Sequence, residues 1–153
     1  MGEELRLRAA GSGDIETLAA LLAAEGLPPM DPAESSTHFH VIDDGQGVVA
    51  VAGIECHGPA ALLRSVVVAP RQRGRGLARR LTEHMADLAG RLGHGVLYLL
   101  TMDAEAYFAG LGFTRVDRDE APEEIRRCRQ FREQCPDSAV LMRRAIASRR
   151  APR

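Results

Sequence analysis

The chain has 153 residues, of which 45% are hydrophobic and 27% charged, the length and composition of one globular domain. A formal net charge of −1, and the lack of any apolar run near the roughly 20 residues of a membrane helix, argue against a nucleic-acid-binding or membrane-spanning protein. The chain has no lysine, so all its basic aliphatic side chains are arginines, whose planar guanidinium suits phosphate and carboxylate partners.

The N-terminus and the cysteines indicate a reducing compartment. Residues 1–4 lack the basic region and apolar stretch of a secretory signal, which predicts a cytoplasmic location. Cys56, Cys128 and Cys135 are odd in number and show no CxxC spacing, so we expect reduced thiols. Because no histidine or acidic residue recurs at zinc-type spacing, the sequence predicts no metal site.

The first half of the chain predicts strands around two helices. Alternating residues predict a strand at 5–9. A helical spacing of apolar residues predicts a helix that follows a cap at Ser12–Asp14 and ends at Gly26. The elements expected next are a short helix at 32–36 and strands at 38–42, 48–55 and 60–68.

The second half predicts helices that alternate with strands. A helical period over 77–92, closed by Gly93, predicts the main helix. The elements expected after it are a strand at 96–100, a helix at 104–111, a strand at 114–116, a helix opening at Pro122 and a strand at 139–143. We find no repeat or linker, so residues 1–147 are expected to form one α/β domain with a basic tail at 148–153.

The clearest motif joins the β-branched run at 66–68 to the helix that begins at Leu77. Gly74 and Gly76 let the main chain approach a ligand closely, and the amides at a helix start favour an anion such as phosphate. A Walker A loop is excluded because the chain has no lysine. A dinucleotide fold is excluded because Arg79 stands where GxGxxG needs its third glycine. An isolated GxG is usually only a connection, but the flanking strand and helix favour a phosphate site here.

The segment Arg73-x-x-Gly76-x-Ala78 resembles the Q/R-x-x-G-x-G/A signature of GNAT acetyltransferases, and it falls between the strand and helix expected for that family. The resemblance implies an α/β (α+β) GNAT fold. Such a fold has a mixed, mostly antiparallel twisted sheet with helices on both faces and two splayed central strands, here ending near Val68 and Leu100.

The resemblance also implies acetyl-CoA as the co-substrate, held mainly by main-chain groups. Backbone groups of Val66, Val67 and Val68 are expected to bind the pantetheine and the acetyl carbonyl. Thr101, where the family often has an asparagine, and Phe108 are further expected cofactor contacts. The residues expected around the pyrophosphate are Arg73, Gly74, Arg75, Gly76, Leu77, Ala78 and Arg79.

Longer segments give a narrower resemblance. They resemble the arsenic-resistance-associated acetyltransferases and the acetyltransferase domain of N-acetylglutamate synthase. The resemblance implies an amino acid or amino-acid analogue as acceptor, leaves a link to arsenic resistance open, and suggests a homodimer. The segments are Leu62-Leu63-Arg64-Ser65, Tyr107-Phe108-x-x-Leu111-Gly112-Phe113 and Gln130-Phe131-x-x-x-Cys135-Pro136-x-Ser138-Ala139.

Acetyl transfer to an amine needs a proton acceptor and a donor for the departing thiolate. Glu55 is the candidate base, because partial burial at the end of an apolar strand would raise its pKa, although it reads equally well as an exposed strand-end carboxylate. His57 is a weaker candidate, since the adjoining Gly-Pro turn suggests exposure. Phe108 occupies the position of the usual tyrosine acid, and the adjacent Tyr107 is rotated from it by about 100° on a helix. The candidate acid is therefore Tyr107, with water or backbone groups as alternatives.

Two residues are candidates for binding the acceptor. Arg64 lies on a central strand, where a buried arginine needs a partner, and it is the best clamp for a carboxylate. Asp31, in the loop expected to line the acceptor side, is the candidate contact for the amine. Three alternatives remain open: a peptide N-acetyltransferase, a CoA-binding sensor without turnover, and an arsenite sensor that uses the cysteines. No nucleic acid or membrane partner is expected.

Overall fold

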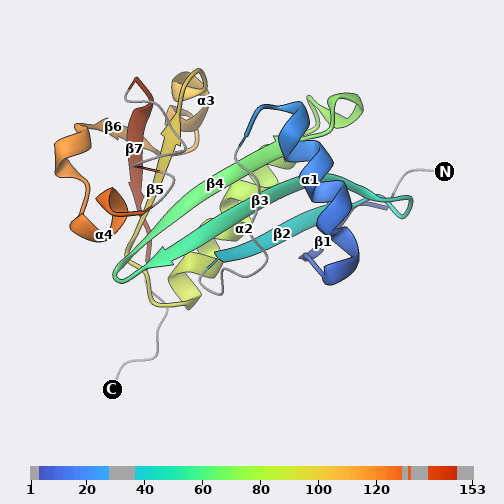
Figure 1. Ribbon diagram of the computed structural model, residues 1–153, viewed down its shortest axis with the longest axis horizontal. Coiled ribbons are helices and arrows are strands. Elements are labelled where there is room, and N and C mark those ends of the chain that lie inside the picture. The colour runs from blue at the N-terminus through green and yellow to red at the C-terminus, as the bar shows by residue number, and fades with distance from the viewer. Residues whose placement is uncertain (1–3, 28–36, 129–130, 132–137, 148–153) are drawn as a thin grey trace. The chain divides into compact units, whose positions relative to one another are not determined.

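The computed structural model describes residues 4–27, 37–128, 131 and 138–147. Those residues form a seven-stranded sheet with the order β1-β2-β3-β4-β5-β7-β6 (Figure 1). The strands are β1 (Arg6–Ala9), β2 (Thr37–Asp43), β3 (Val48–His57), β4 (Ala60–Val68), β5 (Val96–Thr101), β6 (Thr114–Val116) and β7 (Val140–Ala145). The α-helices are α1 (Ile15–Ala24), α2 (Leu77–Arg91), α3 (Glu105–Ala109) and α4 (Glu123–Arg126). The pairs β1/β2, β5/β7 and β6/β7 are antiparallel and β4/β5 is parallel, which confirms the mixed α/β fold class.

The chain forms two compact units, residues 1–54 with 65–85 and residues 55–64 with 86–153. Strands β3 and β4 and helix α2 each contribute residues to both units. The organisation as one domain over 1–147 with a tail at 148–153 stays a prediction. Within the described part of the chain, no helix combines the length and the apolar character that a membrane span requires.

The first unit is built around apolar residues of α1 and of the strands. Leu18 and Leu22, one helical turn apart, are fully buried and pack in one cluster with Val41, Val51 and Val67. Burying a leucine contributes about 1.5–3 kcal/mol relative to leaving it exposed. The amphipathic spacing that predicts α1 therefore also accounts for how the helix is held.

The start of α1 differs from the expected cap. Residues Ser12–Asp14 form a 3₁₀ helix, and the Asp14 side chain makes no cap bond to α1. Its carboxylate instead accepts the Gly11 N–H at 2.7 Å and two bonds from Arg8, at 2.8 and 3.0 Å. Arg8 also bonds Asp43 at 3.0 Å, so one guanidinium ties β1, β2 and the start of α1 together. The expected helix at 32–36 lies outside the described residues.

This arginine–aspartate cluster predicts a loss of stability in acid. The hydrogen bonds from Arg8, and then that from Gly11, lower the pKa of Asp14 to about 2. Since the folded-state pKa lies below the unfolded-state value near 3.8, the stabilisation is complete above that value and is lost as the pH falls towards 2. Because Arg8 is partly exposed, we expect this loss to be about 1 kcal/mol. Urea unfolding at pH values between 6 and 2 measures it.

The matched variants are Asp14→Asn and Asp103→Asn, the second at an exposed aspartate. We expect Asp14→Asn to be destabilised at neutral pH and to lose less of its remaining stability in acid than the parent. Asp103→Asn should follow the parent curve. If Asp14→Asn and the parent lose the same free energy of unfolding between neutral and acid pH, the cluster does not have this role.

The second unit contains the parallel pairing of β4 with β5. Its register runs from Ala60↔Val96 to Leu63↔Leu99, and β5 then pairs β7 from Val96↔Ala145 to Thr101↔Val140. Its core comprises Ala60, Leu62, Tyr98, Ala121, Ile125, Cys128 and Leu141. Helix α4 is only four residues long, and its buried Ile125 holds it against this core.

Two boundaries differ from the sequence expectation in ways that matter for the site. Strand β3 continues through His57, so this histidine lies on a strand and is half-buried, not in an exposed turn. Helix α3 spans only Glu105–Ala109 and ends before the predicted limit at 111, because Gly112 adopts a left-handed φ of 94° just beyond it.

Strand β4 contains an unusual backbone conformation. Ser65 has a φ of 59°, and among the described non-glycine residues it alone has a positive φ. A left-handed residue inside a strand interrupts the ladder and bends the strand, as in a β-bulge. It lies two residues beyond the last pair of the β4/β5 register, Leu63↔Leu99, and directly before the Val66–Val68 run.

Candidate functional site

The predicted strand, turn and helix are all present in the first unit. After β4 the chain makes a 3₁₀ turn at Pro70–Gln72, and α2 begins at Leu77. The Ala69 N–H donates to the Val49 carbonyl at 2.8 Å, which fixes the end of β4 against β3. The prediction of a glycine-rich turn between a buried strand and an amphipathic helix is confirmed.

The two glycines of the turn have the backbone conformation that requires them. Gly74 has φ 78° and Gly76 has φ 76°, in the region that L side chains rarely adopt, and no described heavy atom lies within 4 Å of a β-carbon built at either position. The Arg80 N–H bonds the Gly76 carbonyl at 3.0 Å, so the amides of residues 77–79 precede the first intrahelical bond. Amides of this kind, at the positive end of a 15-residue helix, favour a bound anion, as the sequence analysis predicts.

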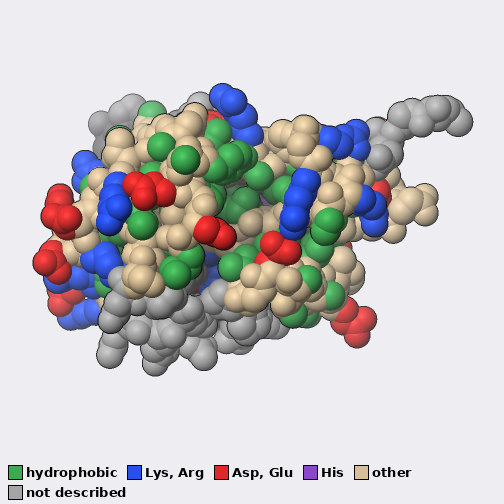
Figure 2. Space-filling model, turned by 90° about the horizontal axis from the view of Figure 1, so that it is seen from above, with side chains coloured by type: hydrophobic (Ala, Val, Ile, Leu, Met, Phe, Trp, Pro, Cys, Tyr) green, Lys and Arg blue, Asp and Glu red, His purple; other side chains and the backbone are tan. Residues whose placement is uncertain are grey.

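The arginine side chains around the turn are engaged with protein groups. Arg73 donates to the Val68 carbonyl at 3.2 Å and pairs with Glu25 at 3.1 Å, and Arg75 donates to the amide oxygen of Gln72. Among the described side chains on the face in Figure 2, arginines are interspersed with acidic residues, so charge alone does not single out a phosphate site there. The main-chain geometry of the turn is therefore the stronger indication.

The other residues predicted to contact the cofactor differ in how deeply their side chains are buried. Val67 belongs to the core of the first unit, while Val66 and Val68 are half-buried on the other side of the strand. The side chain of Leu77 is buried, so only its main chain is available to a ligand. These positions fit a cofactor bound through backbone groups, and their contacts with it stay predictions.

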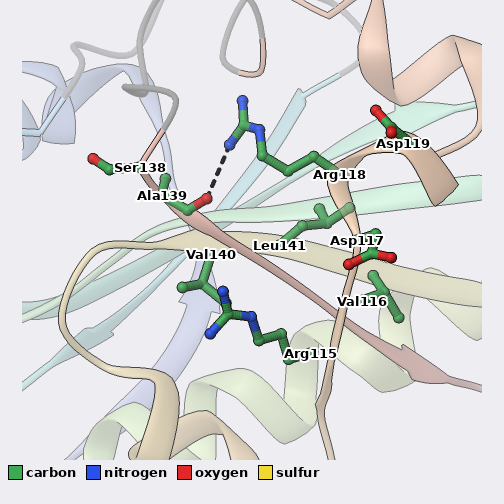
Figure 3. Close-up of a pocket in the computed structure, with 9 residues that line it drawn as sticks. All are labelled: Arg115, Val116, Asp117, Arg118, Asp119, Ser138, Ala139, Val140 and Leu141. Atoms are coloured by element: carbon green, nitrogen blue, oxygen red, sulfur yellow. Dashed lines mark hydrogen bonds between the residues drawn. The ribbon is translucent and has the colours of Figure 1, made fainter.

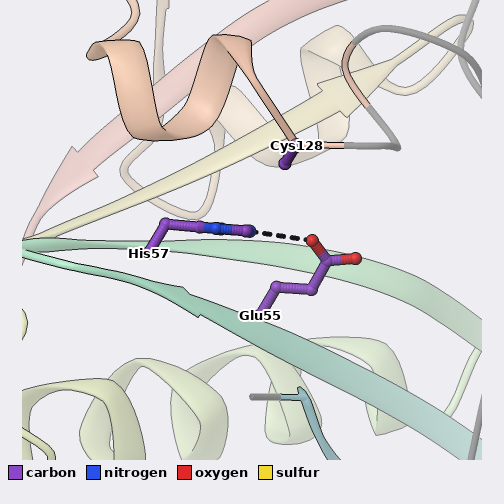
Figure 4. A group of neighbouring side chains, drawn as sticks. All are labelled: Glu55, His57 and Cys128. Atoms are coloured by element: carbon purple, nitrogen blue, oxygen red, sulfur yellow. Dashed lines mark hydrogen bonds and ion pairs between the residues drawn. The ribbon is translucent and has the colours of Figure 1, made fainter. Parts of the chain in front are cut away.

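A cluster of polar side chains is buried in the second unit (Figure 4). Glu55 and His57 lie two residues apart on β3, and the imidazole Nε2 is 2.9 Å from Glu55 Oε1. Arg64 of β4 donates to Glu55 Oε2 at 2.6 Å. Cys128, which follows α4, completes the group, and the ligand atoms of Glu55, His57 and Cys128 lie within 4.8 Å of one another.

The hydrogen-bond partners of Glu55 reverse the pKa shift that was expected for it. Burial acts to raise its pKa, but the hydrogen bonds from His57 and Arg64 outweigh burial, and the net pKa lies below the ordinary value. The expectation of a pKa raised by burial was therefore wrong, because the sequence does not show these two partners. The contact with Cys128, and then that with Glu55, raises the pKa of His57 to about 9.

The cluster decides two of the sequence predictions, the burial of Glu55 and the pairing of Arg64. Glu55 is 6% exposed, so the alternative of an exposed strand-end carboxylate is wrong. Arg64 is buried and paired, as an inward arginine on a central strand must be. Cys128 was not predicted to join a site. The separation of two between Glu55 and His57 could have placed both on one face of a strand, but nothing in the sequence relates Cys128 to them.

Helix α3 places the candidate acid and its neighbour in different environments. Phe108 is buried and packs edge-to-face on Phe113, with ring centroids 5.8 Å apart, whereas Tyr107 is 45% exposed. The rotation expected between adjacent helical residues is confirmed. The Thr101 hydroxyl oxygen accepts the Ala104 N–H at 3.0 Å and so supports the start of this helix. The chemical roles of Tyr107, Phe108 and Thr101 stay predictions.

A hollow of about 410 Å³ lies beside β6 and β7 in the second unit (Figure 3). Arg118 at its rim donates to the Ala139 carbonyl at 3.0 Å and lies 4.4 Å over the Phe131 ring. This arginine therefore joins neighbouring segments, and no predicted site residue lines the hollow. The lining residues are Arg115, Val116, Asp117, Arg118, Asp119, Ser138, Ala139, Val140 and Leu141. Asp31, the predicted amine contact, lies outside the described residues.

Comparisons with known proteins agree with the turn and the fold. Residues 35–115 match the family of acetyltransferase (GNAT) domains. Amino-acid acetyltransferases from two Neisseria meningitidis strains, of serogroups A and B, are each 27% identical over 147 residues, which cover 90% of this chain and 33% of the relative. The chain thus spans about a third of the length of these curated relatives.

Solved structures share the fold. N-acetylglutamate synthase from Neisseria gonorrhoeae, complexed with coenzyme A and N-acetyl-glutamate, is 23% identical with a TM-score of 0.79, covering 95% of this chain and 36% of that chain. A Mycobacterium tuberculosis protein solved in complex with CoA is 17% identical with a TM-score of 0.78, covering 92% of this chain and 99% of that chain.

Proposed function

The chain belongs to the GNAT acetyltransferases, and we propose that it transfers the acetyl group of acetyl-CoA to the amine of an amino acid or amino-acid analogue. The observation that carries the proposal is the turn before α2, where two left-handed glycines present helix-start amides to an anion. The pyrophosphate of acetyl-CoA is the anion that this family binds. The solved complexes of similar fold with coenzyme A support the same donor.

The acceptor class is inferred from Arg64 and from the relatives. The buried guanidinium of Arg64 already donates to Glu55 at 2.6 Å, and in this proposal the acceptor carboxylate shares the same positive charge. The curated relatives are amino-acid acetyltransferases, and one similar structure contains N-acetyl-glutamate. We therefore propose that Arg64, together with the predicted contact Asp31, recognises the carboxylate and the amine of the acceptor. An arsenic-containing amino-acid analogue belongs to the same acceptor class.

The transfer is a direct substitution at the thioester. The neutral amine nitrogen attacks the acetyl carbonyl carbon, the carbon–sulfur bond breaks, and the thiolate leaves as coenzyme A after it gains a proton. Glu55 is the proposed acceptor of the proton that the amine loses, although its bonds with His57 and Arg64 lower its pKa and make it a weaker base than the sequence suggested. Tyr107 is the proposed donor to the thiolate. Because Tyr107 is exposed, water competes with it for that role. Holding the reactants in place supplies much of the acceleration.

A panel of amines tests the proposed acceptor class. With coenzyme A release as the measure, we expect turnover with at least one free α-amino acid. We expect kcat/KM to fall about 10- to 100-fold when the α-carboxylate of that amino acid is replaced by an amide or a methyl ester. The physical reason is that the ester or amide removes the negative charge that pairs with a buried guanidinium.

The same panel separates the competing functions. Higher kcat/KM with peptide N-termini than with any free amino acid would replace the proposal with a peptide N-acetyltransferase. Tight acetyl-CoA binding without turnover on any acceptor would replace it with a CoA-binding sensor, an alternative suggested by Phe108 at the position of the usual acid. A homodimer, which the family resemblance suggests, stays a prediction.

A further inference from the structure

Glu55, His57 and Cys128 present three different metal-ligand atoms towards one another. A carboxylate oxygen, an imidazole nitrogen and a sulfur lie within 4.8 Å of each other, and the nitrogen–oxygen distance is 2.9 Å. From ordinary zinc bond lengths, ligand atoms around one tetrahedral zinc ion lie about 3.5 Å apart. The spacing of the three atoms therefore fits a single ion after small side-chain adjustments. The acetyl transfer assigns no role to His57 or Cys128.

The ligand atoms converge on one point. Figure 4 shows the Cys128 side chain directed towards the end of the imidazole that contacts Glu55. A nucleophilic triad would instead place the carboxylate and the thiol on opposite ring nitrogens, with the histidine between them. The arrangement thus resembles a set of ligands more than a relay of protons.

Arg64 holds the carboxylate in position for such an ion. Its guanidinium bonds Glu55 Oε2 at 2.6 Å, while Oε1 is the oxygen that faces His57. Metal-ligating carboxylates are commonly oriented by an outer partner of this kind.

We propose that Glu55, His57 and Cys128 bind one divalent transition-metal ion, with zinc(II) as the preferred ion and a fourth position left for water or a small ligand. On binding, Cys128 and a protonated His57 each release a proton to solvent as the bonds to the metal form. The sequence predicts no metal site because short-range spacing shows only ligands that are neighbours along the chain. The fold brings Cys128 to Glu55 and His57 of β3, more than 70 positions earlier. The inference does not rest on the proposed acetyl transfer; with an ion bound, Glu55 acts as a ligand and the proton of the amine passes to water instead.

Cobalt(II) is the probe, because a thiolate bound to cobalt gives a charge-transfer absorption that a free thiol does not. The parent is a Cys56→Ser/Cys135→Ser protein, in which Cys128 is the remaining thiol. We expect the absorption to saturate at one cobalt per chain and zinc to displace the cobalt, because zinc prefers tetrahedral sites with thiolate and imidazole ligands. No acetyl-CoA is present, so failure here would leave the proposed function standing.

Variants test each ligand. Adding Cys128→Ser to the parent should abolish the absorption, and adding His57→Ala or Glu55→Gln should weaken cobalt binding at least about 10-fold, with folding checked by circular dichroism. The wild-type protein and Cys56→Ser form the matched pair, because Cys56 lies between Glu55 and His57 on β3 and alternates to the other face. Cys56→Ser should bind as the wild type does. No absorption in the parent, or unchanged affinity in folded His57→Ala and Glu55→Gln, overturns the site.

Discussion

Replacing Gly76 with glutamate is expected to abolish acetyl-CoA binding, with a loss of affinity of at least about 100-fold. Gly76 has a φ of 76°, so any L side chain there strains the turn that orients the amides before Arg80. A glutamate also places a negative charge beside the expected diphosphate, where it repels the ligand. Isothermal titration calorimetry with acetyl-CoA measures the change directly.

Two further variants separate the charge from the backbone effect. Gly13→Glu adds the same side chain at an exposed position of the first 3₁₀ turn, with open space around it, and should leave the affinity unchanged. Gly76→Ala retains the strain without the charge and should give an intermediate affinity. A folded Gly76→Glu protein with parental affinity would show that this turn does not bind the cofactor, and the proposed function would lose its main support.

Replacing Arg64 with methionine is expected to lower the free energy of unfolding by about 3–5 kcal/mol. The substitution removes the guanidinium 2.6 Å from Glu55 Oε2 and leaves the buried carboxylate with His57 as its remaining charged partner. Methionine has a similar length and fills most of the volume, so the loss reports chiefly the broken ion pair. Urea unfolding followed by circular dichroism gives the difference.

The controls for Arg64 use the same substitution elsewhere and the partner residue. Arg71→Met removes an exposed arginine, 3.6 Å from Asp44, and should change stability by less than about 1 kcal/mol. The double variant Glu55→Gln/Arg64→Met should recover part of the loss, because it leaves no buried charge uncompensated. An Arg64→Met protein as stable as Arg71→Met would mean that the pair contributes little to folding.

The glycine-rich turn before α2 was predictable because its determinants are local. A β-branched run, two glycines separated by one residue and an amphipathic repeat specify a strand, a turn and a helix in sequence order. The same reasoning located strands β3 and β4 within two residues of their limits. Helix α4 was predicted only at its start, because a four-residue helix depends on the contact of Ile125 with the core more than on its own repeat.

The buried polar cluster could be predicted only in part. An arginine on a central strand must have a polar partner, so the sequence predicts that Arg64 is paired. It does not identify the partner Glu55, because Glu55 lies on another strand and the register between strands is set by the tertiary fold. The predicted rise in the pKa of Glu55 was wrong for the same reason. The sequence suggested burial, which raises this pKa, but it does not show the two hydrogen-bond partners that lower it. Cys128 joins the cluster through folding alone.

The backbone conformation at position 65 limits which amino acids can stand at that point of β4. A left-handed backbone costs a non-glycine residue about 1 kcal/mol or more, and a β-branched residue suffers most. The valines that suit positions 66–68 are therefore unsuitable one residue earlier, although all lie in the same strand. Position 65 of β4 is therefore expected to tolerate glycine, asparagine or aspartate better than any other replacement.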